Sequence, residues 1–144
     1  MSFARVDEDR IDRLLGKMTL EEKVTLCHAW TKFSVAPIER LGIPELLMSD
    51  GPHGVREEVV RDGWMPANRD DDFVTYLPTG TALAATWNRE MARLHGTLLG
   101  REARGRGKDI ILGPGVNIMR TPLCGRNFEY LGEDPYLAAE LVVP

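Results

Sequence analysis

The chain has 144 residues, the usual size of one domain, and 43 % of them are hydrophobic, which is enough to bury a core. Charged residues make up 28 %, but the formal net charge is only −4, so nothing in the balance favours binding to nucleic acid or to an anionic membrane. No apolar run approaches the ~18–20 residues of a membrane span, and the N-terminal segment lacks the apolar core of a signal peptide. We therefore expect a soluble, cytoplasmic protein.

The cysteines and the acidic run 70–72 give no sign of a metal or a cofactor. Cys27 and Cys124 are far apart in sequence and lack metal-ligand spacing, so we expect free thiols. Asp70, Asp71 and Asp72 have no spaced partner ligands, which favours a solvated loop over a metal site.

Two helices are predicted near the start. In residues 7–16, Leu14 and Leu15 share one face with Ile11, and acidic residues stand near the first turn, where the helix dipole favours them. A second helix follows Thr19, which has with Glu22 the spacing of a capping box.

Three short apolar segments are predicted as strands: 46–49, 81–87 and one within 109–118 that is ended by Gly113-Pro114-Gly115. The first, "LLMS", is typical of a strand buried on both faces. Residues 51–80 are irregular and polar, and loops of this length are usually functional or mobile.

Helices are predicted between and after these strands. Asn88 is expected to cap a helix that runs to about Arg104, and Asp134 with Pro135 to begin a last one. Strands that alternate with helices indicate an α/β fold with a parallel sheet. The last helix has barely formed when the chain stops at Pro144, so we expect the chain to be part of a larger domain.

Polar side chains collect after the first and third predicted strands, where parallel α/β folds bind ligands. Asp50, His53 and Arg56 follow the first, and the third is followed by Asn117, Arg120, Arg126, Asn127 and Glu129. Carboxylates and guanidiniums without a thiol, a metal cluster or a phosphate loop suit a neutral, hydroxyl-rich ligand. Phosphate-loop and GxSxG patterns are absent.

Several long motifs resemble the N-terminal part of family-three glycoside hydrolases, the β-glucosidase and β-xylosidase group. They are "MTLEEKV", "LGIPELLMSDGPHGVR", "LPTGTALAATWN" and "GPGVNIMRTPLCGRNFEYLGEDP". The resemblance covers residues 16–142, and the order and spacing of the motifs also fit.

The resemblance implies a TIM-like (β/α)8 barrel followed by an α/β sandwich. A barrel needs about 250 residues, so residues 1–144 are expected to form only its first three or so βα units, without closure. The later strands and the sandwich would then be absent.

By resemblance, Asp50 holds sugar hydroxyls, with Arg56 beside it and Arg126 on the same sugar. His53, Arg120 and Glu129 are expected to support these residues. The alternative for Asp50, Arg56 and Arg126 is a surface or structural ion pair, and the alternative for His53 is a sugar contact. Trp30, Trp64 and Trp87 are expected to pack in the core or in loops, and Trp64 is the best of the three alternatives for stacking on a sugar, because it lies in the long loop.

The resemblance also implies retaining, exo-acting hydrolysis of β-glucosides, in which one carboxylate attacks and another protonates the leaving group. Both match positions outside this chain, so no catalytic residue is assigned and the chain alone is expected to be inactive. A β-glucosidase is the first reading, although the sequence does not separate it from a xylosidase. The alternatives are a non-catalytic, self-associating fragment, with exposed barrel edges, and an unrelated α/β enzyme.

Overall fold

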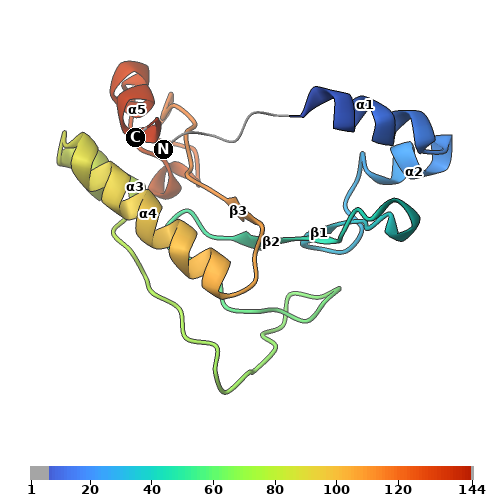
Figure 1. Cartoon of the computed structure of the whole chain (residues 1–144). Coiled ribbons are helices and arrows are strands. Elements are labelled where there is room, and N and C mark those ends of the chain that lie inside the picture. Colours follow the sequence, from blue (N-terminus) through green and yellow to red (C-terminus); the bar gives the residue numbers. More distant parts are fainter. Residues whose placement is uncertain (1–6, 144) are drawn as a thin grey trace. The chain divides into compact units, whose positions relative to one another are not determined.

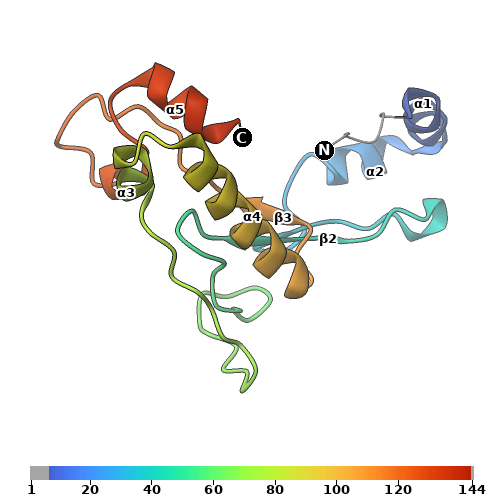
Figure 2. The ribbon, with the colours of Figure 1, turned by 60° about the vertical axis from the view of Figure 1, so that its left-hand side comes forward.

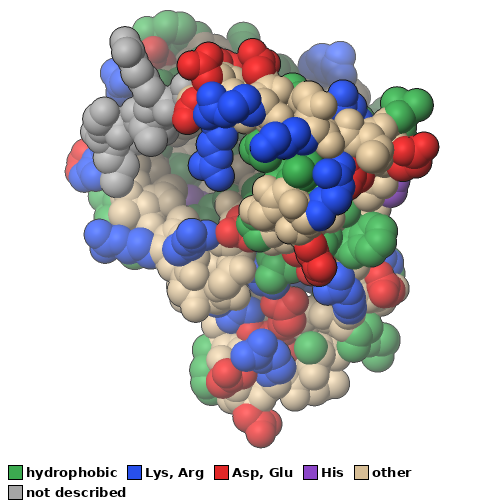
Figure 3. Space-filling view, turned by 45° about the vertical axis from the view of Figure 1, so that its right-hand side comes forward, with side chains coloured by type: hydrophobic (Ala, Val, Ile, Leu, Met, Phe, Trp, Pro, Cys, Tyr) green, Lys and Arg blue, Asp and Glu red, His purple; other side chains and the backbone are tan. Residues whose placement is uncertain are grey.

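The structure is a computed structural model that describes residues 7–143, and these form two compact units that meet in sequence at Leu46 and Leu47. Among the described residues, no helix is long and apolar enough to cross a membrane. Basic and acidic side chains are interspersed on the face shown in Figure 3, in keeping with the small net charge.

The first unit contains α1 (Glu8–Lys17), α2 (Leu20–Thr25), β1 (Ser34–Val35) and the 3-10 turn η1 (Glu39–Leu41). The capping box predicted for Thr19 and Glu22 is confirmed, with both hydrogen bonds present. Glu22 also pairs with Arg40, which donates to the carbonyl of Lys17, so one guanidinium joins both helices to the later turn.

The second unit contains β2 (Leu46–Asp50), α3 (Gly80–Ala85), α4 (Arg89–Gly105), β3 (Ile110–Leu112), the turn η2 (Asn127–Glu129) and α5 (Pro135–Val142). β2 and β3 are parallel neighbours, and Asp50 is level with Leu112 (Figure 1). The helix caps predicted at Asn88 and Asp134 are confirmed. A parallel pair joined through a helix is the α/β arrangement that the sequence predicts.

The strand predicted over residues 81–87 is wrong, because this segment forms helix α3. Its start is fixed by Thr79, whose hydroxyl accepts from the N–H of Ala82. Alanine is the best helix former, and three of the six residues of α3 are alanine, so local propensity decides a run whose periodicity is ambiguous.

The other two strand predictions have different outcomes. The predicted end of the third strand at Gly113-Pro114-Gly115 is confirmed, since β3 spans Ile110–Leu112 and stops directly before it. β2 is not buried on both faces; only Ser49 is fully buried, and its other residues are partly exposed.

Two apolar clusters hold the second unit together. One joins α3, α4 and α5 and consists of Ala84, Ala92, Leu131, Ala138 and Leu141. The other places Val55 and Leu77, from the two ends of the long loop 51–79, against Leu99 and Ala103 of α4. The small alanines let the helices approach closely, and burying a leucine such as Leu99 contributes about 2 kcal/mol. Figure 2 shows the loop leaving β2 and returning to α3.

Candidate functional site

Asp50 is placed by a tight turn at the carboxyl end of β2. The backbone N–H of Arg56 donates to the carbonyl of Asp50 at 2.9 Å and closes the turn. Gly51 and Gly54 have φ of 137° and 145°, and a Cβ on Gly51 would collide with the carbonyl oxygen of Gly54. The turn therefore requires glycine, which explains the break after the strand.

Asp50 and Arg56 form a loose ion pair at this turn. Their nearest charged atoms are 3.9 Å apart, and the two side chains are 48 % and 33 % exposed. The guanidinium of Arg56 also lies 5.2 Å from the ring centre of Trp64, close enough for a cation–π interaction. An exposed pair of this kind contributes at most about 1 kcal/mol to stability. Because its charged atoms are farther apart than a hydrogen bond, both groups keep hydrogen-bonding capacity for a ligand.

Arg126 and Glu129 form a two-pronged pair in the loop after β3. Nε of Arg126 donates to one carboxylate oxygen, and Nη2 donates to the other at 3.1 Å. The hydrogen bond with Glu129 raises the pKa of Arg126, and the charge of Asp50 adds to this effect. The same hydrogen bond lowers the pKa of Glu129. Glu129 is thus a fixed anion that orients Arg126 near Asp50.

His53 connects the two loops. The residue is 8 % exposed, and its ring forms edge-type contacts with the rings of Tyr76 and Phe128, at centroid distances of 6.1 and 6.4 Å. Within residues 7–143, its Nε2 has no hydrogen-bond partner. His53 therefore packs between the segments that carry the charged residues.

His95 of α4, which no sequence pattern singles out, contacts the turn through a hydrogen bond to the backbone of Pro52. Burial lowers the pKa of His95, and its hydrogen bond to the backbone of Pro52 partly offsets this. A histidine on an amphipathic helix gives no sequence signal for such a contact.

A cavity of about 260 Å³ lies beside the turn, lined by residues 51–56 together with Val74, Thr75 and Tyr76. The volume is slightly below the ~300 Å³ at which small-molecule sites begin. Its wall is formed by both ends of the long loop.

The structure thus brings together Asp50, His53 and Arg56, and through Phe128 and His53 it brings the Arg126–Glu129 pair beside them. Arg120 is different: it is exposed, and no hydrogen bond or ion pair of its side chain is seen within residues 7–143. The roles of these residues toward a sugar remain predictions. Over the same residues no cluster of His, Cys, Asp or Glu is arranged to hold a metal.

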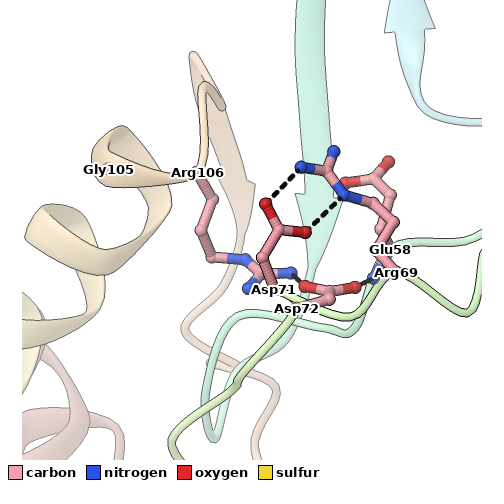
Figure 4. A pocket seen from close by; sticks show the side chains of 6 residues that line it. All are labelled: Glu58, Arg69, Asp71, Asp72, Gly105 and Arg106. Carbon is pink, nitrogen blue, oxygen red and sulfur yellow. Dashed lines mark hydrogen bonds and ion pairs between the residues drawn. The ribbon is translucent and has the colours of Figure 1, made fainter.

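The expectation of a solvated acidic run is wrong for Asp72. Its side chain is only 4 % exposed and pairs with Arg106 at the end of α4 (Figure 4). Asp71 does face solvent, paired with Arg69. The buried pair joins residues 34 positions apart, a relation that no local pattern reveals.

The chain is similar to known proteins of one family. The profile of the "Glycosyl hydrolase family 3 N terminal domain" matches residues 10–144. Beta-glucosidase BoGH3A of Bacteroides ovatus is 57 % identical over 137 residues, which are 95 % of this chain and 18 % of that protein. Thermostable beta-glucosidase B of Acetivibrio thermocellus is 45 % identical over 91 % of this chain and 17 % of its own length.

Solved structures match as well. Beta-glucosidase 3B from Thermotoga neapolitana in complex with glucose has a TM-score of 0.79 and 36 % identity, covering 92 % of this chain and 20 % of that chain. The enzyme from Kluyveromyces marxianus in complex with glucose has a TM-score of 0.78, with 92 % and 15 % covered. The chain therefore spans a fifth or less of the length of these relatives.

Proposed function

Since the chain belongs to glycoside hydrolase family 3 and matches its N-terminal domain, we propose that it supplies part of the sugar-binding site of a retaining, exo-acting β-glucosidase. The family match and the superposition confirm the expected fold class, an open α/β portion of that barrel domain. Relatives named as β-glucosidases, and related structures in complex with glucose, support this activity and substrate.

One observation carries the proposal: a half-exposed carboxylate, Asp50, stands at a strand end, is paired with Arg56 and acts by its charge on Arg126, and each arginine is oriented by another side chain. Trp64 lies against Arg56, and Glu129 grips Arg126. A carboxylate accepts from two neighbouring hydroxyls, and the arginines donate to sugar oxygens. This donor and acceptor set suits a neutral hexose.

We do not assign the chemical step to either carboxylate of this site. A general acid must hold a proton near neutral pH, whereas its bond to Arg126 lowers the pKa of Glu129 and keeps it ionised. Asp50 is engaged with Arg56 and is assigned to the sugar. The nucleophile and the acid/base of the retaining mechanism are thus assigned to the longer protein, and the 144-residue chain alone is expected to be inactive.

The test is hydrolysis of nitrophenyl β-glucoside by the full-length protein and its Asp50→Asn variant. Asp71→Asn, a change in an exposed ion pair, is the matched control. We expect kcat/KM to fall by roughly a hundredfold or more for Asp50→Asn, as for a lost charge-assisted contact in the transition state, and to be little changed for the control. Equal activity of the two variants would show that Asp50 does not contact the sugar. Nitrophenyl β-xyloside, tested in parallel, distinguishes a xylosidase.

A second candidate is a non-catalytic, self-associating chain. It is favoured by an apolar row on α4, where Met91, Leu94 and Leu98 are each more than 40 % exposed. Such a row on a soluble chain favours association. Light scattering of the 144-residue chain tests this: oligomers that dissociate on Leu94→Lys would support it, and a stable monomer would exclude it.

A further inference from the structure

We propose that Arg106 is a positioning residue for the sugar-binding face: it clamps both limbs of the long loop to the end of α4 and so fixes Arg56 beside Asp50. The contacts of Arg106 with the loop do not depend on the proposed function, whereas its effect on catalysis rests on that function.

The guanidinium of Arg106 reaches both limbs of the loop. Nη2 pairs with the carboxylate of Asp72 and also donates to the carbonyl of Arg56 at 3.4 Å. Nη1 donates to the carbonyl of Phe73 at 2.9 Å. Arg56 belongs to the outgoing limb, and Asp72 and Phe73 to the returning limb (Figure 4 shows the approach of Arg106 to Asp72).

Asp72 completes the tie from the other side. The oxygen that Arg106 does not use accepts the backbone N–H of Glu58 at 2.6 Å. Lys108, itself 8 % exposed, pairs with the carboxylate of Glu58 at 2.6 Å. Two cations that follow α4 therefore hold four residues of the loop base, Arg56, Glu58, Asp72 and Phe73.

Burial distinguishes this tie from ordinary surface pairs. The side chains of Arg106 and Asp72 are 14 % and 4 % exposed, whereas Arg69 and Asp71 in the same loop are 58 % and 73 % exposed. Removal of one member of a buried pair leaves an uncompensated charge, so the loop must rearrange when Arg106 is lost. Loss of an exposed pair has little effect.

The clamp acts on the site through the backbone of Arg56. The N–H of this residue donates to the carbonyl of Asp50, and its own carbonyl accepts from Arg106, so both of its backbone groups are held. The returning limb is fixed next to the clamp, where Thr75 N–H donates to the carboxylate of Glu102 at 3.0 Å. Val74, Thr75 and Tyr76 then form one wall of the cavity.

The apolar contacts of Val55 and Leu77 with α4 do not involve the clamp. We therefore expect loss of Arg106 to loosen the loop locally and to leave the unit folded.

The experiment compares Arg106→Ala and Arg106→Lys with Arg104→Ala in the full-length protein. Arg104 is a matched control: it lies two residues away, is 75 % exposed and pairs with Asp109. In Arg106→Ala the amides of Glu58 and Thr75 should exchange at least about tenfold faster, as expected for a local opening. KM for nitrophenyl β-glucoside should rise about tenfold through misplacement of Arg56. Arg106→Lys should recover part of both effects, and Arg104→Ala should change neither.

A double-variant cycle separates positioning from general damage. If Arg106 acts through Arg56, Arg106→Ala should raise KM far less in an Arg56→Ala background than in the parent protein. Full additivity would overturn the positioning role, as would exchange and KM equal to those of the Arg104→Ala control.

If the proposed function is wrong, Arg56→Ala itself should leave KM unchanged. Amide exchange at Glu58 in Arg106→Ala would then still test whether Arg106 holds the loop. Should Arg106→Ala not fold, Asp72→Asn provides the second variant, since it keeps the shape of Asp72 and removes its charge. Unchanged exchange at Glu58 in that variant would overturn the clamp.

Discussion

The carboxylate of Asp72 accepts the backbone N–H of Glu58 at 2.6 Å, although 14 positions separate the two residues along the loop. This bond joins a buried anion to the backbone of the outgoing half of the loop, and the second oxygen of Asp72 meets Arg106. Both contacts are strongest when the carboxylate is ionised.

The order of the loop should therefore depend on pH. Burial acts to raise the pKa of Asp72, but the hydrogen bonds from Glu58 and Arg106 outweigh it, and the pKa is lowered. A lowered pKa in the folded state means that the stabilisation is present above the unfolded pKa, about 3.9, and is lost as the pH falls through the folded value. We expect the protection of the Glu58 amide, corrected for intrinsic exchange, to fall below about pH 4. The same acid profile in Asp72→Asn would contradict this.

The pair of Arg126 and Glu129 should affect substrate binding rather than folding. Glu129→Gln keeps the shape of the side chain but removes the charge that orients Arg126. KM for nitrophenyl β-glucoside is expected to rise by about 5–10-fold in the full-length protein, typical of one weakened charge-assisted contact. Glu90→Gln is the control, because Glu90 forms a similar pair with Arg93 on the exposed surface of α4. A thermal shift without any change in KM would show that Glu129 is only structural.

Gly51 should tolerate no side chain. A Cβ would collide with Gly54, and φ is 137°, so we expect Gly51→Ala to destabilise the 144-residue chain by about 3 kcal/mol or more. Gly100 lies inside α4 with nothing within 4 Å of a Cβ. Gly100→Ala should stabilise the chain by up to about 1 kcal/mol. Denaturant unfolding of both variants checks the contrast, and similar changes in the two would contradict the turn geometry.

Adjacent leucines of α4 should differ in the same assay. Leu99 is 4 % exposed and joins the cluster that anchors the loop, whereas Leu98 is 44 % exposed. Leu99→Ala is expected to lower the free energy of unfolding by about 2–4 kcal/mol. Leu98→Ala should cost less than about 1 kcal/mol, and an equal loss at the two positions would show that the cluster is not a core.

Local chemistry explains which elements could be predicted. The caps at Thr19, Asn88 and Asp134 each depend on residues two or three positions away, so their sequence signal is complete. The strand prediction for segment 81–87 was wrong because a short apolar run fits a strand and a buried helix equally. The alanines and the N-cap at Thr79 are the sequence features that indicate a helix.

The candidate site divides in the same way. Asp50 and Arg56 share one turn, and Arg126 and Glu129 lie three positions apart, so proximity within each pair follows from the sequence. The contact between the two pairs, through the rings of His53 and Phe128, depends on how the loops fold. The buried pair of Arg106 and Asp72 could not be predicted at all. Arginine and aspartate are usually exposed, so residue type gives no sign of their burial.

The base of the long loop is held by Arg106 and Asp72, whereas its tip is not, so sequence changes at the two places should have different effects. Val59 bridges to Pro66 and Val60 N–H donates to the carbonyl of Met65, so the tip forms a small hairpin-like end above the clamp. Insertions or replacements there would alter what lies over Arg56, as Trp64 now does, without moving the tied base. We thus expect changes at the tip to alter the contact with Arg56 while the wall beside Asp50 keeps its geometry.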